Sequence, residues 1–416
     1  MPMPYIIAIN LTRRCNLACT HCYADALQRN ETPQDELTTA EVVRLLEEIG
    51  TRAPGTVIVL TGGEPLLRTD VDALVERGAA AGLHMVIGTN GALLTDSRIR
   101  RLKAAGLSGA GISLDAVQAA QHDAFRGVQG SFDRACGAVR LSRQHALHAQ
   151  IHFTVTRANR RQLARVVPLA RDLGASIVNF FFLICVGRGQ GIIDLTPDEY
   201  EEALRQIARL QAESPGIMVQ ARCAPHFKRV LYERDPDSPF TRATGYDGGG
   251  CVAATHYCRV DPAGEVTPCP YIEMSAGNLR RRPFWEIWEH APLFAAFRQP
   301  ALEGRCGQCQ FKLVCGGCRA RSLVNTGRLF AEDPNCNYVP RGENVIAVLE
   351  QTPIPEGHVA WTAEARARLK HIPIFLRPMV RKKLEERAAS EGVSVTGELM
   401  QRHKEERERE LGIAFK

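Results

Sequence analysis

Fourteen cysteines in a chain of 416 residues constrain this protein more than any other feature of its sequence. They are clustered, because three fall within residues 15–22 and eight more lie between 251 and 336. A cytosolic protein keeps its thiols reduced, so dense cysteines at motif spacing indicate metal binding rather than disulfides. The sequence therefore predicts a chain that folds around metal, with one site near the N-terminus and others in its second half.

The remaining composition argues against several classes of protein. Hydrophobic residues make up 45% and charged residues 24%, which is typical of a globular chain. The longest apolar run, 177–186, is too short for a membrane span and contains Asn179, and no secretory signal is visible. The net charge is only +6, and the basic residues of the C-terminal tail alternate with glutamates as on a solvated helix. We therefore expect a cytoplasmic protein that binds neither a membrane nor a nucleic acid.

The first half of the chain alternates between strand-like and helix-like segments. Apolar, β-branched runs predict six strands, at 5–11, 57–61, 83–89, 109–114, 149–155 and 176–183. Helical patterns separate them, near 39–49, 70–81, 96–105, 117–124, 132–146 and 160–173. The fold class is therefore α/β, with a parallel sheet whose six units suit a partial (β/α)6 barrel rather than a closed barrel of eight.

Polar clusters follow four of these strands. Carboxyl ends of parallel strands meet at one edge of a sheet, so the clusters should gather there. They are Cys15, Cys19 and Cys22 after the first strand, Gly62-Gly63-Glu64-Pro65 after the second, Asn90 after the third, and Ser113 and Asp115 around the end of the fourth. The C-x3-C-x2-C spacing supplies three thiolates to a four-iron cluster and leaves one iron open to another ligand. Zinc is the alternative for these cysteines, with His21 between them.

This cysteine loop, with Tyr23 directly after its last cysteine, resembles that of the radical S-adenosylmethionine (SAM) enzymes, over about residues 10–340. In that family the open iron binds SAM, and one electron from the [4Fe-4S] cluster cleaves SAM to a 5′-deoxyadenosyl radical. A reducing ferredoxin or flavodoxin is the implied electron donor. The resemblance implies SAM contacts from Tyr23, Gly62, Gly63, Glu64, Pro65, Asn90, Ser113 and Asp115. Taken alone, the Gly-Gly-Glu-Pro segment would indicate a plain turn, and Ser-Leu-Asp a helix cap.

The second cysteine group begins after the strand–helix rhythm breaks, which we place after Leu195. Its two C-x2-C pairs stand five residues apart. A zinc ribbon needs about 15–20 residues between such pairs, so the ligands must be shared with distant cysteines. The pattern resembles the SPASM extension of radical SAM enzymes, which holds two auxiliary [4Fe-4S] clusters, although the family has C-x3-C where this chain has Cys315-x2-Cys318.

The SPASM resemblance implies a ligand set for each auxiliary cluster. One cluster would use Cys251, Cys258, Cys269 and Cys318, and the other Cys306, Cys309, Cys315 and Cys336. Three cysteines are left over. We expect Cys136 to be a buried hydrophobic residue and Cys185 to be a candidate for contact with substrate or a cluster, and Cys223 has no predicted role.

Two stretches, 125–132 and 315–336, resemble enzymes of heme d1 synthesis and of the siroheme-dependent heme route, which act on carboxylate side chains of a tetrapyrrole. Arginine forks bind carboxylates, and a Phe run (180–182) suits a flat macrocycle, although solvated arginines and core phenylalanines are the ordinary alternatives. The candidate substrate arginines are Arg126, Arg188, Arg319 and Arg321. No His or Tyr falls in a motif with a defined role, so no general acid or base is predicted.

The C-terminal part reads as a separate module. We predict a linker at 341–358. We predict three short helices after it, at 361–373, at 375–386 and in a segment capped by Thr396. They resemble the small C-terminal module of the protochlorophyllide reductase catalytic subunit, which lies against a tetrapyrrole in that family. The predicted organisation is a barrel (1–195), a helical connection (196–245), a SPASM-like domain (246–340), the linker (341–358) and the helical module (359–416).

The leading hypothesis is a radical SAM enzyme that modifies a tetrapyrrole side chain by decarboxylation, deacetylation or a related step. A SPASM maturase of a ribosomally made peptide is the first alternative. Such enzymes commonly carry a peptide-binding module before the cysteine loop, and here only 14 residues precede Cys15. A non-catalytic iron–sulfur electron carrier is the second alternative. A pure carrier gains nothing from a site with only three cysteines, which favours an enzyme.

Overall fold

A ten-stranded sheet organises the computed structural model, which describes residues 3–28, 35–238, 240–241, 250–342, 344–346, 359–371 and 377–411. All six predicted strands are confirmed, and each pairs in parallel with its neighbours. They are β1 (Ile6–Asn10), β4 (Val57–Thr61), β5 (His84–Thr89), β6 (Gly109–Ser113), β7 (His148–Val155) and β8 (Ile177–Phe182). The strand order β1-β4-β5-β6-β7-β8 is that of the predicted partial barrel.

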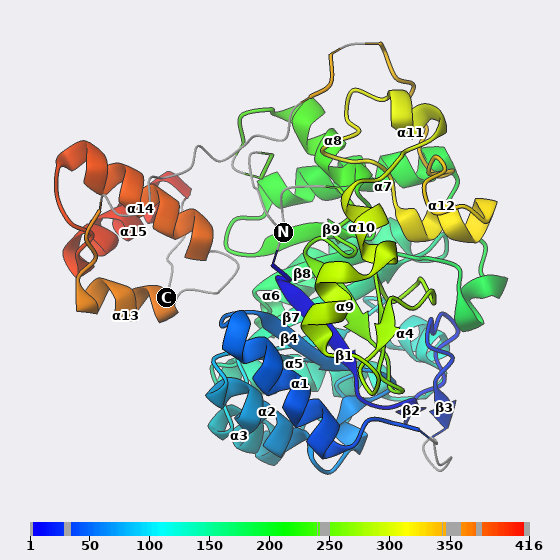
Figure 1. The fold of residues 1–416 in the computed structure, drawn as a ribbon, viewed down its shortest axis with the longest axis horizontal. Helices are drawn as coiled ribbons and strands as arrows, with labels where there is room; N and C mark the ends of the chain where they lie inside the picture. The colour runs from blue at the N-terminus through cyan, green and yellow to red at the C-terminus, as the bar shows by residue number, and fades with distance from the viewer. Residues whose placement is uncertain are drawn as a thin grey trace.

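Helices cover one face of this sheet (Figure 1). They are α1 (Thr39–Arg52), α2 (Val71–Ala80), α3 (Asp96–Ala104), α4 (Ala119–Arg126), α5 (Ser131–Gln144) and α6 (Leu163–Leu173). Side chains of a strand alternate between its two faces. In β7, Ile151 and Phe153 are fully buried. The residues that alternate with them, Gln150, His152 and Thr154, are only half-buried. The buried row packs under the helices. We call the opposite face of the sheet, with the half-buried row, the inner face.

The prediction that the strand–helix rhythm breaks after Leu195 is wrong. Helix α7 (Pro197–Glu213) leads into β9 (Met218–Arg222), which pairs in parallel with β8 and adds a seventh unit before α8 (His226–Arg234). On the other side of the sheet, β10 (Tyr257–Val260) pairs in parallel with β1, followed by the antiparallel strands β11 (Glu265–Thr267) and β12 (Gly277–Asn278). These strands are short, and Val219 is the only fully buried residue of β9, so they lack the apolar runs that marked the others.

The cysteine-rich region is compact and joined to the barrel. Its helices are α9 (Phe284–His290), α10 (Pro292–Arg298), α11 (Gly304–Gln308) and α12 (Arg319–Thr326). The Trp285 indole donates to the Glu48 carbonyl of α1 over 3.0 Å. Two two-residue strands, β2 (Arg14–Cys15) and β3 (Leu27–Gln28), pair at either end of the N-terminal cysteine loop.

The C-terminal helices α13 (Ala363–His371), α14 (Arg377–Glu391) and α15 (Gly397–Leu411) form a lobe of their own in Figure 1. Its core comprises Ala365, Leu384, Ala388, Val395, Leu399 and Met400. The Thr396 hydroxyl accepts from the Leu399 amide over 3.1 Å, which confirms the predicted cap. Most of the predicted linker, residues 347–358, and the predicted start of the second helix at 375 lie outside the described residues.

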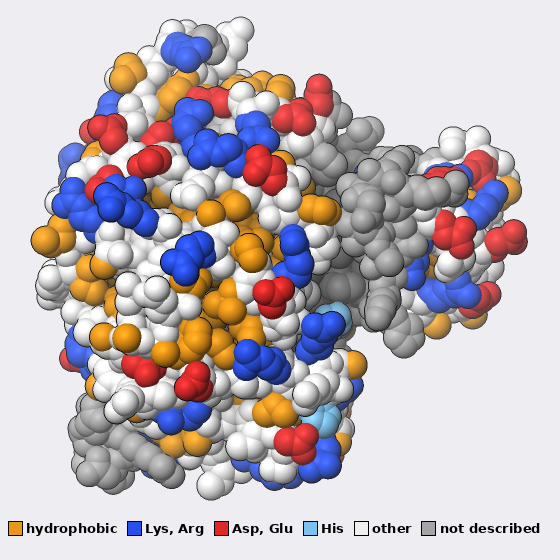
Figure 2. Space-filling view, turned by 180° about the vertical axis from the view of Figure 1, so that it is seen from behind, with side chains coloured by type: hydrophobic (Ala, Val, Ile, Leu, Met, Phe, Trp, Pro, Cys, Tyr) orange, Lys and Arg blue, Asp and Glu red, His pale blue; other side chains and the backbone are white. Residues whose placement is uncertain are grey.

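The surface carries charges of both signs. In Figure 2, basic and acidic side chains are interspersed around a central area of hydrophobic ones. Within the described ranges, no helix is long and apolar enough to cross a membrane.

Candidate functional site

The N-terminal cysteine loop leaves β1 and presents three sulfur atoms, each of which accepts an N–H. The Leu17 amide reaches Cys15 Sγ over 3.5 Å, the Ala26 amide reaches Cys22 Sγ over 3.5 Å, and the Arg126 guanidinium reaches Cys19 Sγ over 3.6 Å. Such donors stabilise negative charge on sulfur and tune iron–sulfur clusters. Burial raises the pKa of Cys15 to about 12, so this thiol ionises only when a metal supplies positive charge. The loop therefore fits an iron–sulfur cluster.

Two arginines that the sequence offered as substrate ligands instead hold this loop. Arg126, at the end of α4, pairs with Asp115 over 2.5 Å in addition to its contact with Cys19. Arg188 donates to the Cys19 and Ala26 carbonyls over 3.0 Å each. Because these guanidinium groups are engaged with the loop, we do not carry them forward as tetrapyrrole ligands.

The glycines of the second polar cluster let the chain pair closely with the start of the cysteine loop. The Gly63 amide donates to the Thr12 carbonyl and the Glu64 amide to the Arg14 carbonyl, both over 2.8 Å. A Cβ atom on Gly63 would overlap the Arg14 carbonyl oxygen, and Gly62 adopts a left-handed φ of 132°. The Gly-Gly-Glu-Pro segment is therefore built against the cysteine loop.

Glu64 connects this segment to the third strand end. Its fully buried carboxylate accepts from the Thr89 hydroxyl over 2.8 Å and from the Asn90 amide over 2.9 Å, and Pro65 begins a short 3-10 helix (Pro65–Leu67) behind it. Burial raises the Glu64 pKa to about 7. The Asn90 side chain donates to Asn16 Oδ1 over 2.8 Å, inside the cysteine loop. The predicted convergence of these strand ends at one edge is confirmed.

Asp115, predicted to contact SAM, is occupied by protein donors. Its carboxylate accepts from Arg126 and, over 2.8 Å, from the Thr154 amide. Burial raises the pKa of this carboxyl, but the charge of Arg126 and the hydrogen bonds outweigh it and hold the pKa below its ordinary value. Asp115 therefore positions Arg126 beside Cys19. Ser113 lies half-buried at the end of β6, on the inner face.

Tyr23 lies between the two cysteine groups. Its hydroxyl accepts from the Asn10 side chain over 3.2 Å, and its ring meets the Tyr271 ring edge-on at 5.4 Å. Burial raises the Tyr23 pKa. Tyr23 therefore contacts the second cysteine group at Tyr271, two residues after Cys269.

The inner face carries polar side chains in register across four strands. Ser113, His152, Asn179 and Gln220 stand side by side on β6, β7, β8 and β9, and Phe181 pairs with Arg222 in the next row. Burial and then the charge of Arg222 lower the His152 pKa to about 4. Arg222 is thus a cation beside a neutral imidazole on this face. The sequence could not indicate it, because β9 was not predicted.

The predicted Phe run divides between the two faces. Phe180 and Phe182 are fully buried under the helices, whereas Phe181 is half-buried on the inner face, beside the His152 ring at 5.0 Å. Only Phe181 is therefore placed to pack against a ligand on that face.

In the second half of the chain, four cysteines line one pocket, and they are the set predicted for the second auxiliary cluster: Cys306, Cys309, Cys315 and Cys336. Amides two residues further on donate to three of these sulfurs, from Phe311 to Cys309 over 3.4 Å, from Gly317 to Cys315 and from Tyr338 to Cys336. Across the part of the chain that the structure describes, no three His, Cys, Asp or Glu side chains come close enough to hold a single metal ion. A pocket lined by four thiols matches the four-thiolate ligand set of a [4Fe-4S] cluster.

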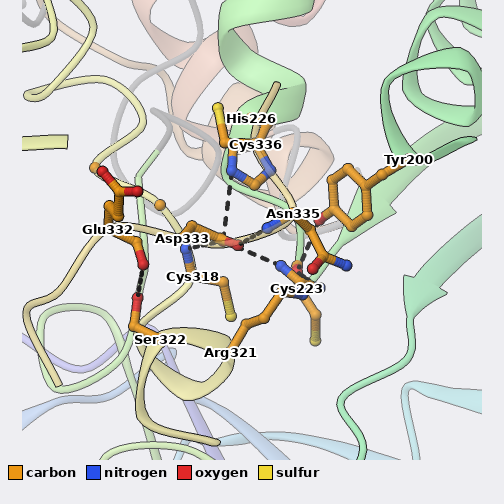
Figure 3. A network of polar contacts seen from close by, with 12 residues as sticks. Tyr200, Cys223, His226, Cys318, Arg321, Ser322, Glu332, Asp333, Asn335 and Cys336 are labelled. Carbon is orange, nitrogen blue, oxygen red and sulfur yellow. Dashed lines mark hydrogen bonds and ion pairs between the residues drawn. The ribbon is translucent and has the colours of Figure 1, made fainter. Parts of the chain in front are cut away.

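The arginines predicted nearby, Arg319 and Arg321, are buried in the protein. Arg319 donates to the carbonyls of Leu329 and Ala331 over 3.0 Å each. Arg321 donates to Asp333 over 3.1 Å and to the Cys223 carbonyl over 3.2 Å, in the network of Figure 3. Both side chains are at most 3% exposed, so they stabilise the cysteine region rather than face a substrate.

Asp333 joins the two parts of this region. Its carboxylate accepts from the Cys318 amide over 2.7 Å and lies 3.4 Å from the buried His226, and both Asp333 and His226 line the four-cysteine pocket. Burial raises the pKa of Asp333, but Arg321 and His226 oppose it and the pKa stays below the ordinary value. Sequence analysis assigned no role to Asp333, because its role depends on contacts across the region.

The set predicted for the first auxiliary cluster is not brought together as a whole. Cys251, Cys269 and Cys318 are electrostatic neighbours, but Cys258 lies within β10, beside Arg298. Of the leftover cysteines, Cys136 is buried in α5 as expected, and the half-buried Cys185 donates to the Ile192 carbonyl over 3.7 Å.

Three family models match separate parts of the chain. Residues 9–170 match the radical SAM superfamily, and residues 251–310 match the iron–sulfur cluster-binding SPASM domain. Residues 361–404 match the proto-chlorophyllide reductase 57 kD subunit. The three resemblances suggested by the sequence are therefore confirmed.

The chain is also similar to curated proteins over most of its length. It is 38% identical to the AdoMet-dependent heme synthase of Methanosarcina barkeri, over 81% of this chain and 97% of that protein. It is 33% identical to the pre-heme d1 synthase of Dinoroseobacter shibae, over 80% of this chain and 86% of that protein. The solved structure of native anSMEcpe with bound AdoMet shares the fold, with a TM-score of 0.62, 19% identity, and coverage of 80% of this chain and 94% of that one.

Proposed function

Since the chain belongs to the radical SAM enzymes with a SPASM domain and is related to the AdoMet-dependent heme synthases, we propose that it removes carboxylate carbon from a tetrapyrrole side chain in heme-type cofactor synthesis. The observation that carries this proposal is the similarity to a heme synthase over 97% of that protein's length. An electron carrier is excluded, because these relatives are enzymes and the N-terminal loop has the three-cysteine form.

Cys15, Cys19 and Cys22 would hold the [4Fe-4S] cluster that binds SAM. When bound, cluster and SAM together supply a 5′-deoxyadenosyl radical. The SAM contacts that we retain are Tyr23, Gly62, Gly63, Glu64, Pro65, Asn90 and Ser113. The raised pKa of Glu64 supports this assignment, because a buried carboxylate whose desolvation outweighs its hydrogen bonds gains stability when a cation such as the SAM ammonium binds nearby. Asp115 and Arg126 act by fixing Cys19.

The inner face offers the chemistry that a tetrapyrrole requires. Arg222, whose guanidinium donates to Asn179 Oδ1 over 3.2 Å and to Gln220 Oε1, is the cation on this face that would attract a carboxylate, and Phe181 provides a ring surface for the macrocycle. His152 remains neutral beside Arg222, so it adds hydrogen bonding without a second positive charge. A propionate held in this way would present its carbon chain to the radical.

The proposed step is an oxidative decarboxylation. Loss of one hydrogen atom to the radical and of one electron to an acceptor converts a propionate into a vinyl group and CO2, with 5′-deoxyadenosine as the second product. The two auxiliary [4Fe-4S] clusters proposed for the SPASM region would accept the electron released in this step. A ferredoxin or flavodoxin would supply the electron that cleaves SAM.

The test is product analysis with a matched pair of variants. Anaerobically reconstituted protein is incubated with SAM, dithionite and either Fe-coproporphyrin III or siroheme, and products are followed by mass spectrometry. We expect one of these tetrapyrroles to lose CO2 and two hydrogens per side chain, and Arg222→Gln to reduce this product at least tenfold while Arg205→Gln on exposed α7 leaves it unchanged. Unchanged tetrapyrroles, with 5′-deoxyadenosine still formed, would contradict the proposal and favour a peptide substrate.

A further inference from the structure

Cys258, which the SPASM resemblance assigned to the first auxiliary cluster, points away from the other cysteines of its set. It pairs with Ile7 in the parallel ladder of β10 and β1, so its side chain lies in the same row as the buried Ile7, under the helices. The next residue, Arg259, lies on the inner face, where it donates to the Pro270 carbonyl over 3.0 Å, directly after Cys269. Adjacent residues of a strand face opposite ways, so Cys258 faces away from Cys269.

The surroundings of Cys258 are those of a core residue. Its side chain is fully buried, and its charged neighbour is Arg298 of α10. The Arg298 guanidinium lies over the Trp288 ring at 4.7 Å and donates to the Ala254 carbonyl over 2.9 Å. Cys258 thus packs beneath α9 and α10, as Cys136 packs within α5.

Cys223, which had no predicted role, lies where the fourth ligand is needed. It follows β9 directly, and Tyr271, which follows Cys269 by two residues, is among the polar neighbours of its sulfur. Its electrostatic neighbours include Cys251, Cys269 and Cys318, the three members of the set that do lie together. Figure 3 shows Cys223 and Cys318 with their sulfur atoms directed to the same side of the Asp333 network.

The backbone at Cys223 is held in place by the same network. Its φ is +56°, a left-handed conformation that a non-glycine residue adopts at a cost and keeps only where its surroundings fix it. Its carbonyl accepts from Arg321 over 3.2 Å and from the Tyr200 hydroxyl over 3.4 Å. Arg321 in turn bonds Asp333, which accepts from the Cys318 amide, so one network orients both cysteines.

We infer that the first auxiliary cluster is held by Cys223, Cys251, Cys269 and Cys318, and that Cys258 is a core residue. This inference rests on the proposed presence of an auxiliary cluster in the SPASM region. Such a cluster would tie the last strand of the barrel, β9, to the cysteine region that follows β10. Its ligand Cys223 directly follows Arg222, so the cluster would lie next to the proposed substrate face.

The test separates this cluster from the SAM cluster by working in a background with Cys15, Cys19 and Cys22 all changed to Ala. Two auxiliary cubanes give about eight irons per chain in that background. We expect Cys223→Ala to lower the count to between about four and seven, with a three-iron electron paramagnetic resonance signal if one iron is lost, whereas Cys258→Ala and Cys136→Ala keep about eight.

The opposite pattern, or full iron in both variants, would overturn the inference. If the variant without Cys15, Cys19 and Cys22 binds no iron, the proposal of auxiliary clusters fails. The proposed SAM reaction is not affected by that result, because it is measured with the unaltered chain.

Discussion

The N-terminal cysteine loop and the region from 250 to 340 both gather cysteines, but they draw them from very different distances along the chain. The loop places its three cysteines within eight residues. Under the inferred assignment the second region draws on partners as far apart as Cys223 and Cys318, and the strands that flank them lie at opposite ends of one sheet. A compact motif carries its geometry in its spacing, whereas a dispersed site takes its geometry from the fold.

The two regions nevertheless use the same supporting device. In each, a buried aspartate pairs with a buried arginine beside a cysteine, as Asp115–Arg126 beside Cys19 and as Asp333–Arg321 beside Cys318 and Cys223. A buried ion pair is costly to break, so it holds one geometry. We therefore expect rigid thiol positions in both regions, although only one of them is proposed to bind SAM.

The largest expected effect separates the two regions by function. Cys19→Ala should abolish 5′-deoxyadenosine formation, because the SAM-binding cluster loses a ligand. Cys318→Ala should retain SAM cleavage without tetrapyrrole product, because it affects an auxiliary cluster alone. Anaerobic assays of 5′-deoxyadenosine check both variants. Undiminished 5′-deoxyadenosine from Cys19→Ala would refute this distinction between the two regions.

The next effect compares the two buried ion pairs. Arg126→Met and Arg321→Met each leave an aspartate buried without its partner, and each should lower the free energy of unfolding by about 3–5 kcal/mol. Arg100→Met, which removes an exposed pair with Asp96, should leave the free energy of unfolding nearly unchanged. Anaerobic urea unfolding measures all three. A small loss in only one buried pair would show that the two regions are not supported alike.

A smaller effect tests the close packing of the N-terminal loop. Gly63→Ala places a Cβ atom against the Arg14 carbonyl and should cost about 1–3 kcal/mol, with weaker SAM binding. Gly137→Ala in α5 has open space around it and should be neutral or stabilising by up to about 1 kcal/mol. Thermal unfolding and SAM titration compare the pair, and equal SAM affinity in both would argue against a packed role for Gly63.

The smallest expected effect concerns the C-terminal module. Its core is self-contained, so a chain that ends at residue 346 should unfold at the same temperature as the barrel of the full chain. If the module covers the substrate, truncation should weaken tetrapyrrole binding about tenfold, or about 1.4 kcal/mol, in a Soret-band titration. Equal affinity in both chains would assign the module another role.

The sequence predicted six parallel strands and the gathering of their ends because apolar runs and compact motifs are local signals. It missed β9 and β10, whose few residues carry little apolar character. It therefore also missed Arg222 and Cys223, since their roles follow from that strand. Spacing alone placed Cys258 in a ligand set, but the alternation of β10 turns its side chain the other way.

The predicted arginines show the same limit. Arg126, Arg188, Arg319 and Arg321 were chosen because guanidinium groups bind carboxylates. In the structure all four contact the two cysteine regions. The partner of an arginine can lie more than 100 residues away in the sequence, as Cys19 does from Arg126. Residue type predicted the chemistry, but only the fold identified the partner.

The most direct test of the account follows one hydrogen atom. Fe-coproporphyrin III deuterated on its propionate carbons is incubated for a single turnover with SAM and dithionite, and 5′-deoxyadenosine is analysed by mass spectrometry. We predict that deuterium appears in 5′-deoxyadenosine from the unaltered enzyme, and that its amount rises together with the amount of vinyl product. Deuterium-free 5′-deoxyadenosine, with the tetrapyrrole bound but unchanged, would contradict it.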